Sequence, residues 1–207
     1  ALQWSLVGSE MCIRDRYHNT MKYDKIDTNL FIKNRKNFIN KLEQNSVAFF
    51  NSNDIYPVSA DSTLPFEQHR DIFYLSGIDQ EESILVLFPD SLNENFKEIL
   101  FIRETNDHIV HWEGEKLTQS DAFKISGIKN VHWLGEFDNI LSKILKEADH
   151  VYINTNEHYR QNVETQTRED RFIEKLKNFG GLSFQKSNPI LQYQRSVHNE
   201  IELGLIT

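Results

Sequence analysis

The 207-residue chain is poor in the residues that carry several common chemistries, with one cysteine, Cys12, and eight glycines. A single thiol excludes an internal disulfide framework and a metal cluster held by several thiolates. The glycines form neither a GxGxxG nor a GxxxxGK(S/T) motif, and a GxSxG motif is also missing. The usual signatures of dinucleotide binding, of P-loop nucleotide binding and of the α/β-hydrolases are therefore excluded.

Long apolar runs and an excess of positive charge are missing too. The longest uninterrupted run of aliphatic and aromatic residues is Ile84–Phe88, whereas a helix needs roughly 20 residues to cross a bilayer. The formal net charge of -8 disfavours a nucleic-acid partner, which would call for a basic face. Because 39% of the residues are hydrophobic, the chain can still bury a core. We expect a globular, cytoplasmic protein that binds neither membranes nor nucleic acid.

The two ends of the chain differ from its body. Residues 1–20, which include Cys12, have no sustained periodicity and no basic region followed by an apolar one, so they do not form a secretory signal. Met21 looks like a true start, and we interpret residues 1–20 as a non-native leader translated from adapter or vector sequence. A disordered native extension is the alternative. At the other end, Arg195–Thr207 has apolar residues at every fourth position, which predicts a helix without a final cap and a chain that continues in the intact protein.

Between these ends, strand patterns alternate with helix patterns. Asp27 can cap a helix whose apolar face includes Phe31 and Phe38. Short β-branched runs are typical of buried strands, and apolar offsets of three and four residues are typical of amphipathic helices. Strands are predicted at Val47–Phe50, Ser83–Phe88, Ile99–Ile102, Val151–Ile153 and Leu182–Phe184, and helices at Phe137–Ala148 and Phe172–Phe179. This alternation predicts an α/β fold with a mixed or mostly parallel central β-sheet flanked by helices.

The residues show no catalytic constellation. His108 and His111 lie beside Glu113 in a segment interpreted as a hairpin, where positions three apart face opposite sides of a strand. A solvated turn is therefore favoured over a zinc site. Carboxylates such as Glu81, and the mixed charges of residues 164–171, are interpreted as solvated surface.

Several short motifs nevertheless follow one another in a characteristic order. In chain order they are Phe31-x-x-x-Arg35, Ser59-x-Asp61, Pro65-Phe66-x-Gln68, Asp71-x-Phe73-Tyr74-Leu75-x-Gly77, Leu100–Arg103 and Trp112-Glu113-Gly114. From Met21 to about Leu203, this arrangement resembles the N-terminal domain of aminopeptidase P, the Xaa-Pro aminopeptidases of the creatinase/prolidase superfamily.

The resemblance implies a division into residues 21–186, the aminopeptidase P N-terminal domain, and residues 187–207, a linker and the truncated start of a pita-bread metallopeptidase domain. In that family the metallopeptidase domain holds two metal ions, usually Mn²⁺, which activate a hydroxide for attack on the peptide carbonyl. No catalytic residue and no metal ligand is therefore expected in this chain. The full-length protein would release the N-terminal residue from peptides with proline second, and the chain by itself would be inactive.

The resemblance also implies homo-oligomers, dimers or tetramers, in which this domain borders the active-site cleft of its own or a neighbouring subunit. Trp112 and Asp61 are the residues expected to contact substrate there, Trp112 by apolar contact and Asp61 by orienting a basic group or the substrate amine. From the residues alone, Trp112 is either tucked against its own domain or offered to a partner. Asp61 can equally be a turn-capping aspartate before Ser62.

Two alternatives remain open. The chain could be a non-catalytic binding or assembly module of the same fold, or part of a prolidase that acts on Xaa-Pro dipeptides. Metal ligands encoded beyond Thr207 would favour an enzyme, and their absence would favour the assembly module.

Overall fold

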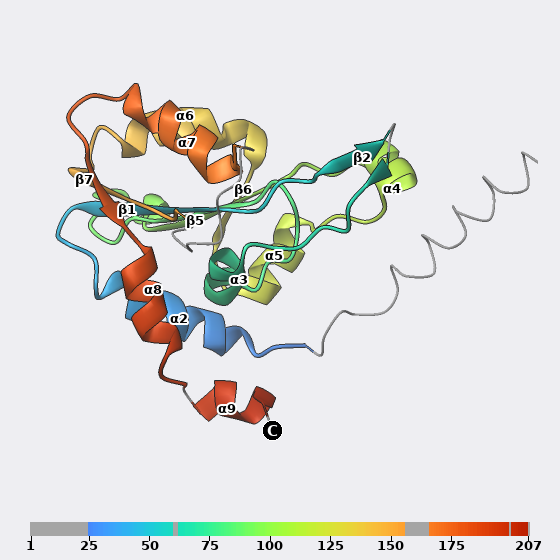
Figure 1. Ribbon diagram of the computed structural model, residues 1–207, viewed down its shortest axis with the longest axis horizontal. Helices are drawn as coiled ribbons and strands as arrows, with labels where there is room; N and C mark the ends of the chain where they lie inside the picture. The colour runs from blue at the N-terminus through green and yellow to red at the C-terminus, as the bar shows by residue number, and fades with distance from the viewer. Residues whose placement is uncertain (1–24, 60–61, 156–165, 199, 207) are drawn as a thin grey trace, which may run out of the picture.

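The computed structural model describes residues 25–59, 62–155, 166–198 and 200–206. Within this part, a sheet of six strands has the order β6-β5-β4-β1-β7-β8. Figure 1 shows this sheet nearly edge-on. Their bounds are β1 Ser46–Asn51, β4 Ile84–Leu87, β5 Glu98–Ile102, β6 Asn130–Trp133, β7 His150–Ile153 and β8 Ser183–Lys186. Strand β4 pairs antiparallel with β1 and β5, while the other pairs are parallel. The predicted mixed sheet is confirmed.

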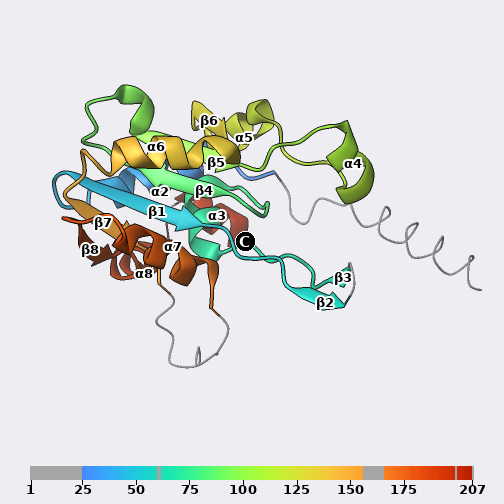
Figure 2. The ribbon, with the colours of Figure 1, turned by 90° about the horizontal axis from the view of Figure 1, so that it is seen from above.

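Helices cover both faces of this sheet (Figures 1 and 2). On one face lie α6 Phe137–Ile144 and α7 Arg168–Lys177. On the other lie α2 Thr28–Ile39, α3 Arg70–Ser76, α5 Gln119–Ser126 and α8 Asn188–Arg195. Two short 3₁₀ turns, η1 Glu94–Phe96 and η2 Leu134–Glu136, complete the connections.

The central strands β1 and β4 are buried along their whole length because both of their faces are covered. In β1, Val47 and Phe49 pack into the core under α6 and α7. Ala48 and Phe50 pack into the opposite core, as the two-residue alternation of a strand requires. The continuous apolar runs in the sequence therefore mark strands that fill two cores at once.

Helix α2 begins as predicted, since the side chain of Asp27 accepts a hydrogen bond from a backbone N–H in the first turn. On the same helix, the buried Arg35 donates from Nη1 to the carbonyl oxygen of Leu75 at 2.8 Å. Helix α3 ends at Gly77, where φ is 71° and an added Cβ would lie 2.4 Å from the ring of Phe31. These contacts tie α2 to α3.

Residues 103–117 differ from the predicted hairpin, because they contain helix α4, Asp107–Glu113. The side chain of Asn106 accepts a hydrogen bond from the backbone N–H of Ile109 at 3.0 Å. Gly114, with φ of 84°, follows the last turn. Asn106 and Gly114, which were interpreted as hairpin turn residues, thus cap a short helix instead.

The helix predicted over Arg195–Thr207 is wrong in its extent. Helix α8 ends at Arg195, and α9, Glu200–Ile206, follows after a break. Pro189 lies in the first turn of α8, where backbone N–H groups have no partner within the helix, so the missing N–H of proline costs no helical hydrogen bond. Leu191 of α8 is buried in the same core as α2 and α3. The division after residue 186 stays a prediction, and residues 1–20 lie outside the described part of the chain.

Candidate functional site

Two segments project from one edge of the sheet. After β1 the chain forms the ribbon of β2, Pro57–Ser59, and β3, Ser62–Thr63, and after β5 it forms α4. Strands β1 and β5 both pair antiparallel with β4, so their carboxyl ends lie at the same edge. Figures 1 and 2 both show the ribbon and α4 at the same end of the molecule. We call residues 55–59, 62–64 and 107–113 the projecting surface.

The two residues predicted to contact substrate belong to these segments of the chain. The backbone of Trp112 lies in α4, and its side chain is outside the described part of the structure. Asp61 is also outside the described residues, between β2 and β3. The substrate contacts of both residues stay predictions.

Large apolar side chains of the projecting surface lie in contact with solvent. Val58 is 58% exposed and Leu64 is 55% exposed. Ile55, Tyr56 and Val110 are exposed as well. Single exposed apolar residues are ordinary on a protein surface, but a group of them on two protruding segments is typical of a contact surface.

An ionic cluster fastens α4 to the sheet edge. Arg103 follows β5 directly and pairs with Glu113 through two nitrogens. Its Nη1 lies 2.6 Å from Oε2 of Glu113, and its Nη2 donates a hydrogen bond to Oε1 at 2.8 Å. Its Nε lies 3.3 Å from Oε2 of Glu82, and its Nη1 lies 3.5 Å from Oε1 of Glu81. Lys116 pairs with the same Glu81 oxygen. This bidentate pairing fixes orientation as well as distance, which a lysine could not do at position 103.

The cluster holds its charges although it is partly desolvated. Burial opposes ionisation of Glu81, but the hydrogen bond and charge of Lys116 and the charge of Arg103 keep the pKa of Glu81 below its ordinary value. Burial likewise opposes the charge of Arg103, yet the hydrogen bond to Glu113 and the charges of three carboxylates raise its pKa. The prediction that Glu81 is solvated surface is wrong, because ion pairs replace its water.

A second carboxylate departs from the same prediction. Glu169, in the first turn of α7, is 8% exposed, and its Oε1 accepts hydrogen bonds from Asn51 N at 3.0 Å and Asn51 Nδ2 at 3.1 Å. Burial raises the pKa of Glu169 to about 7, although the Asn51 bonds and the charge of Arg168 favour the ionised form. The mixed charges of this helix therefore do not all face water, since its first turn packs on the end of β1.

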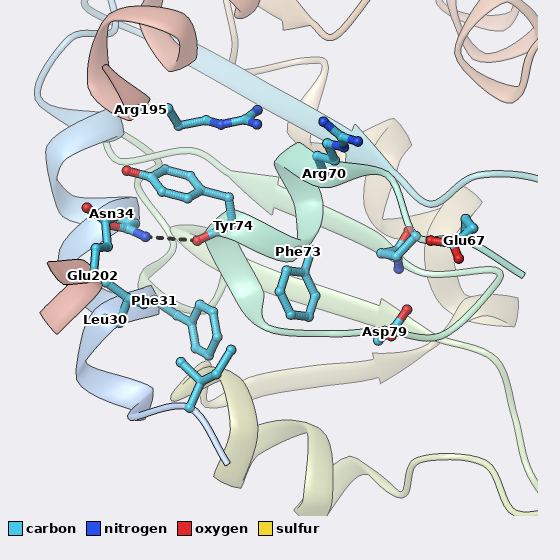
Figure 3. Close-up of a pocket in the computed structure, with 12 residues that line it drawn as sticks. Leu30, Phe31, Asn34, Glu67, Arg70, Phe73, Tyr74, Asp79, Arg195 and Glu202 are labelled. Carbon is cyan, nitrogen blue, oxygen red and sulfur yellow. Dashed lines mark hydrogen bonds between the residues drawn. The ribbon is translucent and has the colours of Figure 1, made fainter. Parts of the chain in front are cut away.

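A cavity of about 400 Å³ lies between α2, α3 and the C-terminal helices (Figure 3). Its walls include the side chains of Phe31, Phe73 and Tyr74, and charged groups such as Arg70 and Asp79 line it as well. The cavity therefore lies at the contact between the helices α2 and α3 and the C-terminal helices α8 and α9.

An ion pair and hydrogen bonds connect α8 to α2 and α3 beside this cavity. Arg195, at the end of α8, pairs with Asp71 through Nη1 and Oδ1 at 2.6 Å, and its guanidinium lies 5.9 Å from the ring centroid of Tyr74. Asn34 Nδ2 donates to the carbonyl oxygen of Tyr74 at 3.1 Å, and Gln194 Nε2 donates to that of Asn34 at 2.8 Å. These contacts hold α8 against α2 and α3.

The described residues do not fit a dinuclear metal site. Among them, no three or more His, Cys, Asp or Glu side chains come together in a way that could hold a metal ion. His108 and His111 lie on one helix, α4, rather than on a strand, but they belong to no such group. In the part of the chain that the structure covers, no helix is long and apolar enough to cross a membrane.

Residues 31–152, more than half of the chain, match the family model described as "Aminopeptidase P, N-terminal domain". The chain belongs to this family. Among curated proteins, the aminopeptidase P domain is similar to Xaa-Pro aminopeptidase 3 of Homo sapiens, with 30% identity over 103 residues, or 49% of this chain. It is also similar to Xaa-Pro aminopeptidase of Escherichia coli, with 27% identity over 122 residues, or 59% of this chain.

Solved structures share the fold. A structure from Bacillus anthracis assigned to aminopeptidase P superposes with a TM-score of 0.77 at 25% identity, over 87% of this chain and 43% of that one. Aminopeptidase P from Escherichia coli in a low-pH form superposes with a TM-score of 0.70 at 22% identity, over 87% and 41%. The chain spans only 20% of the human relative and 27% of the Escherichia coli one, so the family and the fold are shown for part of those proteins' length.

Several motif residues of this aminopeptidase P domain have a packing role. Phe31, Arg35 and Gly77 tie α2 to α3. The pairing of Arg103 with Glu113 and the burial of Glu169 were not predicted from the sequence. The available signal for Arg103 was its position, a charged residue directly after a buried strand, where the carboxyl edge of an open α/β sheet begins.

Proposed function

We propose that this chain is the N-terminal domain of an Xaa-Pro aminopeptidase, whose full-length form releases the N-terminal residue from peptides with proline second. The observation that carries the proposal is the projecting surface, an exposed apolar ribbon together with a helix fixed by ion pairs, on a domain of the aminopeptidase P family. The names of the human and Escherichia coli relatives support this substrate class. Proline in second place lacks the N–H that ordinary peptidases engage, which is why such bonds call for a dedicated enzyme.

The catalytic part lies, in this proposal, in a further domain that holds two Mn²⁺ ions and supplies an activated hydroxide. The chain alone is then inactive. The full-length enzyme is located in the cytoplasm in this proposal. The test compares the 207-residue chain with the full-length protein on a peptide with proline second, in the presence of Mn²⁺. Turnover by the chain alone, or tight stoichiometric Mn²⁺ binding to it by calorimetry, would overturn the assignment.

The role of the domain itself is to form homo-oligomers and to border the active-site cleft. Val58 and Leu64 would lose their solvent contact when the projecting surface packs against a second subunit. We expect Leu64→Glu to shift the full-length protein towards a smaller species in analytical ultracentrifugation. Leu92→Glu is the matched control, because Leu92 is 93% exposed and follows β4 at the opposite edge of the sheet. Equal sedimentation of the two variants would remove the ribbon from the interface.

Trp112 and Asp61 are proposed to border the substrate, Trp112 through apolar contact and Asp61 through a basic group or the substrate amine. In the full-length protein, Trp112→Ala is expected to lower kcat/KM while the thermal unfolding temperature stays unchanged. Asp61→Asn would test the charge in the same assay. Unchanged kinetics in both variants would mean that neither residue meets the substrate.

Two other functions use the same domain. A prolidase would hydrolyse Xaa-Pro dipeptides and reject longer peptides, so a series of peptide lengths separates it from the aminopeptidase. An assembly module without a competent catalytic domain would form oligomers but show no hydrolysis at any length.

A further inference from the structure

A second cavity, of about 430 Å³, lies on the opposite face of the sheet from the cavity in Figure 3. It opens where β1 ends and where α6 and α7 begin. The residues that line it include Phe137, Asp138, Arg168, Arg171, Phe172 and Lys175. None of the predicted site residues belongs to it, and the proposed peptidase function does not use it.

The lining is positive on a chain that is otherwise acidic. It holds three cations, Arg168, Arg171 and Lys175, against the single carboxylate of Asp138. The formal net charge of the whole chain is -8, so this concentration of positive charge runs against the overall balance. A concave site lined by one sign of charge raises the local concentration of ions of the other sign.

Two of the three cations already have carboxylate partners. Arg171 pairs with Oδ1 of Asp54 at 2.6 Å, and Lys175 pairs with Asp138. Arg168 differs from these two residues. Within the described residues, its guanidinium donates one hydrogen bond, from Nη1 to Oγ of Ser52 at 3.2 Å, and it forms no ion pair.

Arg168 is also poorly hydrated for a charged group. It is half-buried, and burial lowers the pKa of its guanidinium, although the charges of Asp54, Glu82 and Glu169 oppose this effect. A guanidinium has five N–H donors in a planar fork that matches a carboxylate or a phosphate. Most of that fork is unused among the described residues, and an anion in the cavity would complete it.

The floor of the cavity is apolar and aromatic. The rings of Phe137 and Phe172 lie 6.0 Å apart, and Nζ of Lys175 lies 5.5 Å from the centroid of Phe137. Leu134 and Ile84 extend this floor. A bare inorganic ion would leave the apolar floor without contact, whereas an anion with a ring or short chain would cover it.

We propose that this cavity binds a small organic anion, with its carboxylate or phosphate group on Arg168 and its apolar part on Phe137 and Phe172. The volume suits a molecule of roughly the size of an aromatic acid, since small-molecule sites generally measure about 300–1,000 Å³. The site is separate from the projecting surface, so it can be tested whether or not the peptidase function holds.

The experiment titrates the 207-residue chain with phenyl phosphate, benzoate, inorganic phosphate and the neutral benzamide, by calorimetry and by NMR. We expect saturable binding of phenyl phosphate or benzoate with a Kd below about 1 mM, and weaker binding of inorganic phosphate and benzamide. The tighter of the two aromatic anions identifies the headgroup that the site prefers.

Arg168→Gln should weaken this binding at least about tenfold, because it removes a charge-assisted bidentate contact. Arg168→Lys should lose part of the affinity, and Lys175→Gln should lower it without touching Arg168. Lys146→Gln is the control, since it removes the same charge from an exposed position outside the cavity. Circular dichroism confirms that each variant is folded.

Three results would overturn the proposal. They are the absence of saturable binding of either aromatic anion up to about 10 mM, equal affinity in Arg168→Gln and the parent chain, and binding of benzamide as tight as that of benzoate. The second result would leave Arg168 with a purely structural role on Ser52.

Discussion

Glu169 makes the stability of this domain depend on pH in a direction opposite to that of most carboxylates. Its pKa is raised to about 7 from an ordinary 4.5, with burial as the main cause. Between these two values the folded chain holds a proton that the unfolded chain releases. The free energy of unfolding therefore falls as the pH rises through this window, and the loss is complete above pH 7.

The size of the effect follows from the same two values. A gap of about 2.5 pH units, at about 1.4 kcal/mol per unit, amounts to about 3 kcal/mol. Glu169→Gln abolishes the titration while its side-chain oxygen can still accept the two hydrogen bonds from Asn51. The new amide N–H₂ would replace Oε2, which has no hydrogen-bond partner among the described residues, and this adds a cost that does not vary with pH.

The assay is urea unfolding of the parent chain and of Glu169→Gln at several pH values from 4.5 to 8. The stability of the variant relative to the parent should rise by about 3 kcal/mol across this range, whatever the constant offset between them. Glu174→Gln, at an exposed position on the same helix, should show no such trend. Parallel stability curves for Glu169→Gln and the parent would refute the reasoning, because they would mean that Glu169 does not titrate in this window.

Three further predictions concern the packing and ion pairs of the domain. Gly77→Ala should lower the free energy of unfolding by about 3 kcal/mol, because φ is 71° there and the new Cβ would meet the Phe31 ring at 2.4 Å; an unchanged melting temperature would contradict this. Arg195→Ala loses the ion pair with Asp71, so it should speed proteolysis between α8 and α9 without changing the core. Arg195→Lys keeps a positive charge and should be cleaved more slowly than Arg195→Ala. Arg103→Gln should speed amide hydrogen exchange in α4 by about tenfold or more while β4 and β5 keep their protection; equal rates in α4 would mean that the ionic cluster does not fasten it.

Five strands of the central sheet and the helices α2, α6 and α7 were predictable because their signals are local. Val47–Phe50 and Ser83–Phe88 are continuous apolar runs, and such runs need cover on both faces wherever they lie in the sheet. The cap at Asp27 depends on residues within one turn of the helix. The periodicity in these segments needed no knowledge of the tertiary structure.

Predictions failed where local signals were ambiguous. Asn106 and Gly114 favour a turn or a helix cap equally, and only the packing of α4 through Glu113 onto Arg103 distinguishes the two. The pattern over Arg195–Thr207 suits one helix, but α8 ends at Arg195, the residue whose side chain pairs with Asp71. In both cases the sequence pattern contains no information on the contacts between residues far apart in the chain.

Periodicity and motif order along the chain were enough to predict the α/β class, the family and five strands of the central sheet, because these signals come from neighbouring residues. Strand β6, Asn130–Trp133, was not predicted. Which charged groups are desolvated became apparent only from the three-dimensional structure. Glu81 and Glu169 look like ordinary surface carboxylates in the sequence, yet one is buried in ion pairs and the other against the end of β1. Likewise, Arg168 acquires its half-buried, largely unused guanidinium only where α7 meets β1, since burial is a property of the neighbours that folding assembles around a side chain.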